Sequence, residues 1–108
     1  RVGLARAFAI EPKLIFMDEP FSALDSFTAA TLREEFLKIW ETKRPTIVMV
    51  THNIAESIEL SDRIAVITSR PAKIEHIFIN HLDKPRQKRS QPFFDLEDEI
   101  DAKLKLHR

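Results

Sequence analysis

Leu14-Ile-Phe-Met-Asp-Glu-Pro-Phe-Ser-Ala-Leu-Asp25 is the stretch that decides the fold of this chain. Its first four residues are apolar and predict a short strand buried on both faces, as in a parallel sheet. Pro20 cannot donate a ladder hydrogen bond, so the strand has to end by Glu19. Asp18 and Glu19 therefore stand at its carboxyl end, where open α/β sheets bind ligands. Two adjacent acids alone more often mark the exit of a strand into a solvated loop. Whether these two bind a ligand therefore has to be judged from the residues downstream.

A helix is expected next, at about residues 27–42. Apolar residues recur there at spacings of three and four and define one buried face: Ala29, Leu32, Phe36, Ile39 and Trp40. Asp25 or Ser26 can cap its amino terminus. The preceding loop, Phe21 to Asp25, consists mainly of small residues. This helix thus starts directly after the acidic strand end.

A second strand carries another polar side chain at its carboxyl end. Residues 46–51 are rich in β-branched side chains and predict a buried strand, which runs into His52. Asn53 and Glu56 then form a capping box for a short helix. The order strand, helix, strand, helix, strand is typical of parallel α/β architecture.

The flanking segments extend this pattern. Residues 1–10 predict a helix that Glu11-Pro12 ends. Residues 63–68 predict a third strand, and residues 73–80 a partly exposed antiparallel strand at the edge of a mixed sheet.

A basic segment follows residue 80. Its charges, Lys84, Arg86, Lys88 and Arg89, lack an accompanying aromatic stacking pattern, which favours a solvated connector over nucleic-acid or membrane binding. Asp95 is expected to cap a terminal helix with a narrow apolar stripe, which predicts weak packing or packing against a partner outside the chain. We therefore predict two parts, residues 1–80 and 81–108.

Composition narrows the classes of protein. The 108 residues contain 17 basic and 17 acidic side chains, so no global field favours nucleic acid or anionic lipid. The chain has no cysteine, which excludes disulfides and thiolate metal sites and fits a reducing compartment. Aliphatic runs are far shorter than the ~20 residues that span a bilayer. Gly3 is the one glycine, so a glycine-rich phosphate-binding loop cannot lie within the sequence.

Taken together, the motifs resemble those of the ATP-binding-cassette (ABC) ATPases over about residues 1–70. Residues 1–8 are similar to the run after that family's signature motif, and residues 14–25 resemble its Walker-B strand and D-loop. Val50-Thr-His-Asn-Ile-Ala-Glu56 resembles the switch-histidine region, although Asn53 stands where the family usually has an acid. Ser61-Asp-Arg-Ile64 completes the match, and the motifs follow the family's order and spacing. The other histidines, His76, His81 and His107, match no motif.

The resemblance implies a role for each matched residue. Asp18 would help to hold Mg²⁺ and contact the nucleotide, Glu19 would orient and polarise the attacking water, and His52 would contact the γ-phosphate of ATP. The D-loop residues would cross a dimer interface: Ser22, Ala23, Leu24 and Asp25.

The fold implied is a P-loop NTPase-type α/β fold, with a mostly parallel sheet flanked by helices. The P-loop, Q-loop and signature Ser-Gly-Gly would lie upstream of Arg1, so we expect the carboxyl-terminal portion of such an ATPase, inactive by itself. The complete protein would be a Mg²⁺- and ATP-dependent importer subunit on the cytoplasmic face of the membrane.

The expected partners are a second ATPase subunit, membrane-spanning permease subunits and, indirectly, a solute-binding protein, with no nucleic acid. Arg70-Pro-Ala-Lys-Ile-Glu75 and Asp83-Lys-Pro-Arg86 look similar to importers of nitrate, sulfonate or taurine. The alternative is a soluble ABC-type ATPase that acts on nucleic acid or ribosomes.

Overall fold

The computed structural model describes residues 13–69 and 72–106, and the chain divides into two compact units, 1–52 and 53–108. The described elements follow in the order β1 (Leu14–Asp18), α2 (Ser26–Lys43), β2 (Thr46–Val50), α3 (Ile54–Leu60), β3 (Arg63–Ser69), β4 (Ala72–Ile79) and α4 (Gln91–Leu106). The helix predicted at residues 1–10 lies outside the described residues.

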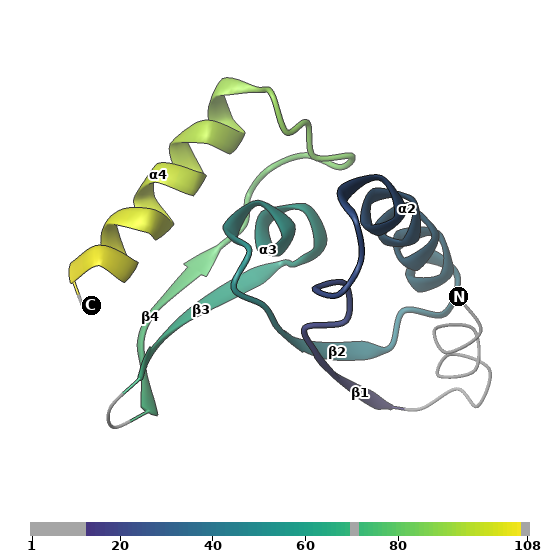
Figure 1. The fold of residues 1–108 in the computed structure, drawn as a ribbon, viewed down its shortest axis with the longest axis horizontal. Helices are drawn as coiled ribbons and strands as arrows, with labels where there is room; N and C mark the ends of the chain where they lie inside the picture. Colours follow the sequence, from purple (N-terminus) through teal and green to yellow (C-terminus); the bar gives the residue numbers. More distant parts are fainter. Residues whose placement is uncertain (1–12, 70–71, 107–108) are drawn as a thin grey trace. The chain divides into compact units, whose positions relative to one another are not determined.

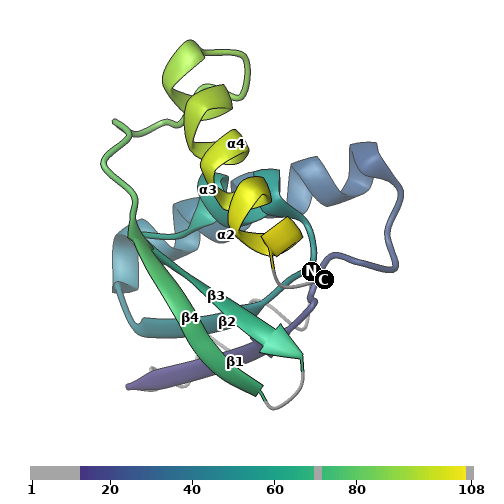
Figure 2. The same cartoon turned by 90° about the vertical axis from the view of Figure 1, so that its left-hand side faces the viewer.

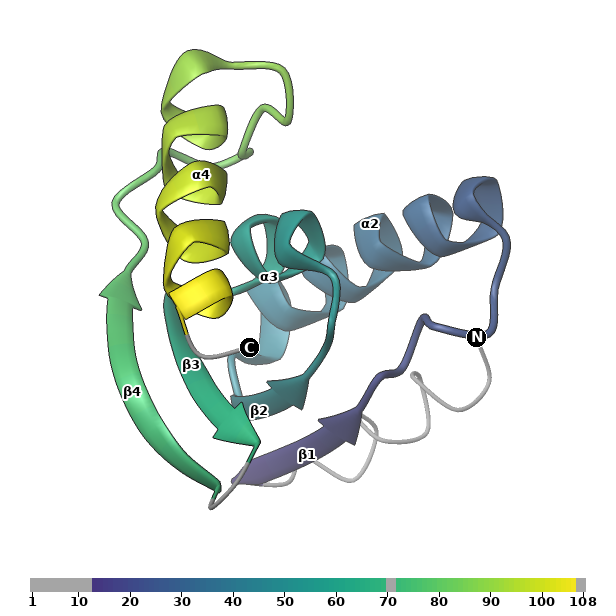
Figure 3. The same cartoon turned by 60° about the vertical axis from the view of Figure 1, so that its left-hand side comes forward.

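The first unit joins two parallel strands through a helix. β1 and β2 pair in parallel from Leu14 opposite Thr46 to Asp18 opposite Val50, and α2 lies on one side of this sheet (Figure 1 and Figure 3). α2 ends where Arg44 takes a left-handed conformation and its backbone N–H donates to the Trp40 carbonyl at 2.7 Å. This α/β arrangement with a parallel strand pair confirms the predicted fold class.

The expectation that β1 and β2 are buried on both faces was wrong. Ile15 is 8% exposed, whereas Phe16, its neighbour on the opposite face, is 65% exposed. A strand's side chains alternate between the two faces, and a face is buried only where another element covers it. The even-numbered positions of this sheet form the exposed face: Leu14, Phe16, Val48 and Val50.

The buried face of α2 matches the prediction in part. Ala29 and Phe36 are buried as expected, while Leu32, Ile39 and Trp40 are half-buried. Arg33 is buried although the apolar periodicity gave no reason to expect it. Such a burial depends on packing that a hydrophobic pattern does not record.

The second unit is a β-hairpin covered by two helices. β3 and β4 pair antiparallel as a sheet of their own, which faces the viewer in Figure 2, rather than as the edge of one mixed sheet. A short connection favours this local pairing. The core shared by α3, β3 and α4 is apolar and comprises Ile58, Ile64, Val66, Phe93 and Ile100.

α4 begins earlier and packs more firmly than the sequence indicated. It starts at Gln91, where the Ser90 hydroxyl accepts from the Phe93 backbone N–H at 3.4 Å, so Asp95 does not cap it. Pro92 is tolerated because the first turn needs no N–H from it. Phe93 and Ile100 are almost completely buried, which contradicts the expected weak packing.

The basic segment is exposed at most of its positions, as expected of a solvated connector, but Arg86 departs from this prediction. The Arg86 side chain is 3% exposed, donates to the Glu59 carbonyl at 3.4 Å and lies 3.6 Å from an Asp62 carboxylate oxygen. Lys88 pairs with Glu59 at 3.1 Å and Lys84 with Asp62 at 3.5 Å. The carboxyl end of a helix attracts cations, and the acids at the end of α3 add to that attraction. Residues 81–106 thus pack into the second unit, which begins at residue 53.

Candidate functional site

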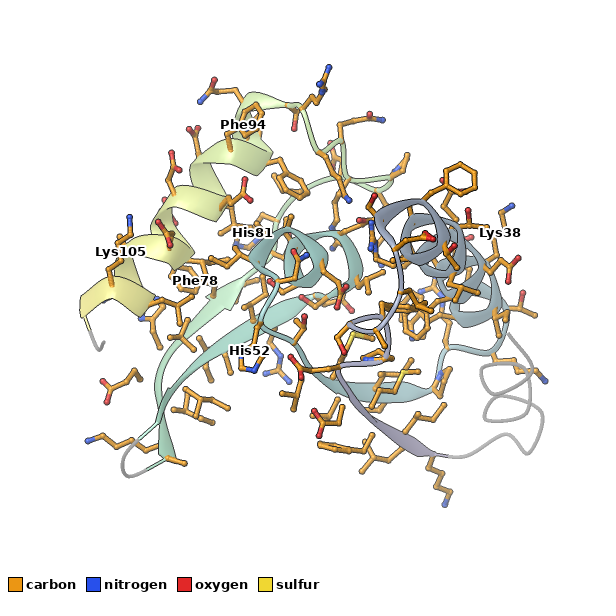
Figure 4. All side chains as sticks on the ribbon, in the orientation of Figure 1. Lys38, His52, Phe78, His81, Phe94 and Lys105 are labelled. Atoms are coloured by element: carbon orange, nitrogen blue, oxygen red, sulfur yellow. The ribbon has the colours of Figure 1, made fainter. Side chains whose placement is uncertain are left out.

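The carboxyl ends of β1 and β2 bring three of the predicted site residues to one edge of the parallel sheet. Asp18 pairs with Val50 in the register, and the Glu19 N–H donates to the Val50 carbonyl at 2.7 Å. Because parallel strands point the same way, Asp18, Glu19 and His52 leave the sheet at the same edge. Figure 4 labels His52 just beyond the end of β2.

Glu19 and His52 contact each other directly. His52 Nε2 lies 3.3 Å from Glu19 Oε1, with the histidine side chain 89% and the glutamate side chain 33% exposed. An exposed pair of this kind adds little to stability. Both side chains can therefore exchange this contact for one with a ligand.

The backbone of Glu19 is in an unusual conformation. Its φ angle is 46°, in the left-handed region that non-glycine residues seldom adopt. Hydrogen bonds fix it on both sides: its N–H donates to Val50, and its carbonyl accepts from the Ser22 N–H at 3.3 Å and the Ser22 hydroxyl at 3.1 Å. Backbone strain of this kind collects at functional sites. Pro20 disfavours the right-handed helical region at Glu19 but favours an extended backbone, so no signal in the sequence indicated the left-handed conformation.

Phe21 anchors the loop between β1 and α2, which no pattern in the sequence indicated. Phe21 is buried, and its ring meets that of Phe36 edge-on, with centroids 6.3 Å apart and planes at 83°. Its carbonyl also accepts from the Leu24 N–H at 3.3 Å. The four residues beyond it, which the resemblance predicts to be a D-loop, are all exposed: Ser22, Ala23, Leu24 and Asp25.

Asp25, one of the two residues expected to cap α2, is its amino-terminal cap. Its Oδ1 accepts from the Thr28 N–H at 2.7 Å and its Oδ2 from the Thr28 hydroxyl at 3.0 Å. The hydrogen bond from the Thr28 backbone N–H has the larger effect and that from its hydroxyl the smaller, and together they hold the pKa of Asp25 below its usual value of 3.8.

The acids at the end of β1 suit a hard cation that is shared with a substrate. Asp18 is exposed and adjoins Glu19, so carboxylate oxygens are accessible at this edge. Within residues 13–69 and 72–106, no group of three or more histidines and acids could hold a metal by itself. Mg²⁺ fits such a site, because it uses one or two carboxylates and completes its shell with water and phosphate oxygens.

Known proteins with similar sequences decide the family. The aliphatic sulfonates import ATP-binding protein of Bacillus thuringiensis subsp. konkukian is 44% identical over 100 residues, which cover 93% of this chain and 40% of that protein. The nitrate import ATP-binding protein of Synechococcus elongatus is 45% identical over 89 residues, 82% of this chain and 32% of that protein. The chain matches a part of the ABC transporter ATP-binding subunits. The resemblance in the sequence is thereby confirmed.

Two further observations accompany this assignment to the ABC ATP-binding subunits. An uncharacterized ABC transporter ATP-binding protein of Methanocaldococcus jannaschii is 42% identical over 93% of this chain and 38% of its own length. The chain thus spans 32% to 40% of the length of these curated relatives. No family model matches the chain.

None of the helices in the part of the chain that the structure describes is long and apolar enough to span a membrane.

Proposed function

We propose that this chain carries the hydrolytic residues of an ATP-binding subunit that energises an ABC importer. The observation that supports this most directly is the contact of Glu19 with His52 at 3.3 Å, at the carboxyl edge of a parallel strand pair. The relatives are named as import ATP-binding proteins, which supports ATP as the ligand of this site. The reaction is attack of water on the γ-phosphorus of ATP, which breaks the bond to ADP and releases inorganic phosphate.

Glu19 is proposed to orient and polarise the attacking water. Its carboxylate is partly exposed at the strand end, so a water molecule can reach it, and an acid placed within hydrogen-bond distance of the water can accept its proton. The hydrogen bonds of the Glu19 backbone restrict the positions that this carboxylate can take. Such pre-positioning is what the step requires.

His52 is proposed to contact the γ-phosphate. Its Nε2 faces Glu19 Oε1 in the structure, and the imidazole is almost fully exposed. An N–H donor at this place can move to a phosphate oxygen when nucleotide arrives. Asp18 would hold Mg²⁺ together with the nucleotide, and the cation would neutralise charge on the phosphates.

The partners proposed for the complete protein follow from the exposed loop and from the relatives. The exposed residues Ser22 to Asp25 are available for contact with a second ATPase subunit. Permease subunits and, indirectly, a solute-binding protein would complete the importer, with this subunit on the cytoplasmic face. Relatives are named for sulfonate and nitrate import. We therefore propose a small solute of this kind, nitrate, a sulfonate or taurine, as the cargo.

The isolated 108 residues are proposed to be inactive. Backbone N–H groups approach phosphates closely where several glycines lie together, and Gly3 is the one glycine of this sequence. Without such a loop the chain lacks the backbone N–H groups that would bind the triphosphate most tightly. Glu19 and His52 then have no firmly placed substrate.

A role on nucleic acid finds less support. The basic side chains that could have formed a phosphate-binding surface, Lys84, Arg86 and Lys88, lie against acids or a carbonyl of the second unit. Charges already paired in this way attract phosphates more weakly. Tight, salt-dependent binding of the intact protein to DNA or ribosomes would favour this alternative over transport.

The proposed role of Glu19 is tested with Glu19→Gln in the complete subunit. We expect ATP binding to persist and turnover to fall about 10²- to 10⁴-fold, because glutamine cannot accept the proton of water. Glu34→Gln removes an exposed acid from α2 and is the matched control, with turnover unchanged. Undiminished turnover in the Glu19 variant would refute the assignment.

A further inference from the structure

We propose that Ser22 is a positioning residue for Glu19: its hydroxyl holds the Glu19 carbonyl and so sets the direction of the Glu19 carboxylate. The inference rests on the proposed role of Glu19 in hydrolysis. It gives Ser22 a task within its own chain, in addition to the subunit contact expected of the loop.

The geometry that supports this role is centred on one peptide unit. Glu19 has a φ angle of 46°, a conformation that a side chain with a Cβ avoids unless its surroundings impose it. On the amino side, the bond from its N–H to Val50 at 2.7 Å ties it to β2. On the carboxyl side, both hydrogen bonds to its carbonyl come from Ser22, one from the N–H and one from the hydroxyl.

The Ser22 hydroxyl is therefore the side-chain group that limits rotation about the Glu19 backbone. With its N–H held by Val50, a change in the φ angle of Glu19 would move both its carbonyl and its side chain, and would swing the carboxylate away from its place 3.3 Å from His52 Nε2. A carboxylate that samples several directions spends less time beside the attacking water, and the turnover rate falls with that fraction.

The fold depends little on the same hydroxyl. Ser22 is exposed, so truncating it leaves no cavity. The loop is anchored separately, by Phe21 packed on Phe36 and by the Leu24 N–H bonded to the Phe21 carbonyl. Removing the hydroxyl should consequently change the position of Glu19 more than it changes stability.

The experiment compares Ser22 variants in the complete ATP-binding subunit. For Ser22→Ala we expect kcat to fall about three- to tenfold, the effect of one lost hydrogen bond, with KM for ATP unchanged. Ser22→Thr retains the hydroxyl and restores kcat. Ser22→Cys offers a weaker donor, so its kcat should lie between those of the threonine and alanine variants.

Thr42→Val is the matched control. It removes a hydroxyl that donates to the Lys38 carbonyl at 3.3 Å, in the same unit but at the far end of α2. Its kcat and KM should equal those of the wild type. A thermal unfolding scan of each variant reports stability separately from turnover.

Glu19→Gln, measured alongside, separates this inference from the proposed function. If that variant retains turnover, the role of Glu19 itself is wrong. If it is inactive while Ser22→Ala has wild-type kcat, Ser22 is not a positioning residue and the proposed function stands. A raised KM with unchanged kcat, or failure of Ser22→Thr to restore kcat, also overturns the inference.

A double variant adds a last check. Because Ser22 is proposed to act through the Glu19 carboxylate, Ser22→Ala should not further reduce the residual single-turnover rate of Glu19→Gln. An independent reduction of the same size as in the wild type would contradict the inference.

Discussion

Single residues at two strand ends carry the chemistry that we propose for this molecule. Asp18 and Glu19 follow β1, His52 follows β2, and the parallel pairing of Asp18 with Val50 brings these ends together. The Glu19 and His52 side chains already touch, although neither is buried. The structure thus arranges an acid and a donor side by side in a position that a nucleotide and water can reach.

His52 provides the prediction at this scale. In the complete subunit, His52→Ala should lower turnover about 10- to 100-fold, the loss expected for one hydrogen bond to a charged phosphate. His81→Ala removes an exposed histidine that matches no motif, and its turnover should remain at the wild-type level. Steady-state ATPase rates of the two variants check this. A His52 variant as active as the His81 variant would exclude contact between His52 and the γ-phosphate in the rate-limiting step.

The sequence predicted which residues meet at the site, but not how they are held. Parallel strand ends follow from the alternation of buried strands and helices, so the proximity of Glu19 and His52 could be predicted. The left-handed backbone at Glu19 and its hydrogen bonds to Ser22 could not, because they depend on how a particular loop closes. Pro20 only disfavoured the right-handed helical conformation for the Glu19 backbone.

At the scale of elements, more than one residue can be a suitable cap for the same helix, and packing decides which of them the helix uses. Ser90 and Asp95 are both good amino-terminal caps, and α4 uses Ser90. Pro92 was the overlooked signal, since proline is favoured in the first turn and not before a cap. The early start places Phe93 in the core, which the capping pattern alone could not reveal.

Burial on both faces of a strand was a similar error. A continuous apolar run shows that a strand can be buried, and the partner that covers each face lies elsewhere in the chain or beyond it. Arg86 shows the reverse case. Its charge predicted an exposed side chain, yet the acids and the carbonyl at the end of α3 make its burial favourable.

The cap of α2 gives the prediction for an element. Hydrogen bonds from Thr28 stabilise the charged form of Asp25 and lower its pKa below 3.8 in the folded chain. The stabilisation is therefore fully present above pH 3.8 and is lost as the pH falls through the folded pKa. Asp25→Ala should lower the melting temperature at neutral pH, and the difference from the wild type should shrink below pH 3.8.

Thermal unfolding followed by circular dichroism measures this effect. Asp25→Asn is the control, because asparagine caps helices about as well as aspartate and does not titrate. It should retain most of the stability at neutral pH. A difference between Asp25→Ala and the wild type that persists unchanged in acid would show that the charge of Asp25 contributes nothing to the cap.

At the scale of the whole molecule, each unit presents an apolar sheet face to solvent. In the first unit this face comprises Leu14, Phe16, Val48 and Val50, and in the second unit the exposed side chains of the hairpin are Ile67, Ile74, Ile77 and Ile79. Contiguous apolar patches of this kind are rare on stable monomers and promote association. We therefore expect the isolated chain to self-associate as its concentration rises.

Sedimentation velocity at increasing concentrations measures this association. Phe16→Asp and Ile77→Asp each place a charge on one exposed face, where the desolvation of a carboxylate opposes contact. Each substitution should shift the distribution toward the monomer, and the two together should shift it further if both faces contribute. Lys38→Asp, an exposed substitution on α2, changes the net charge by the same sign without touching either face and should leave association unchanged. A chain that stays monomeric at all concentrations, or that responds equally to Lys38→Asp, would show that these faces do not drive contact between copies.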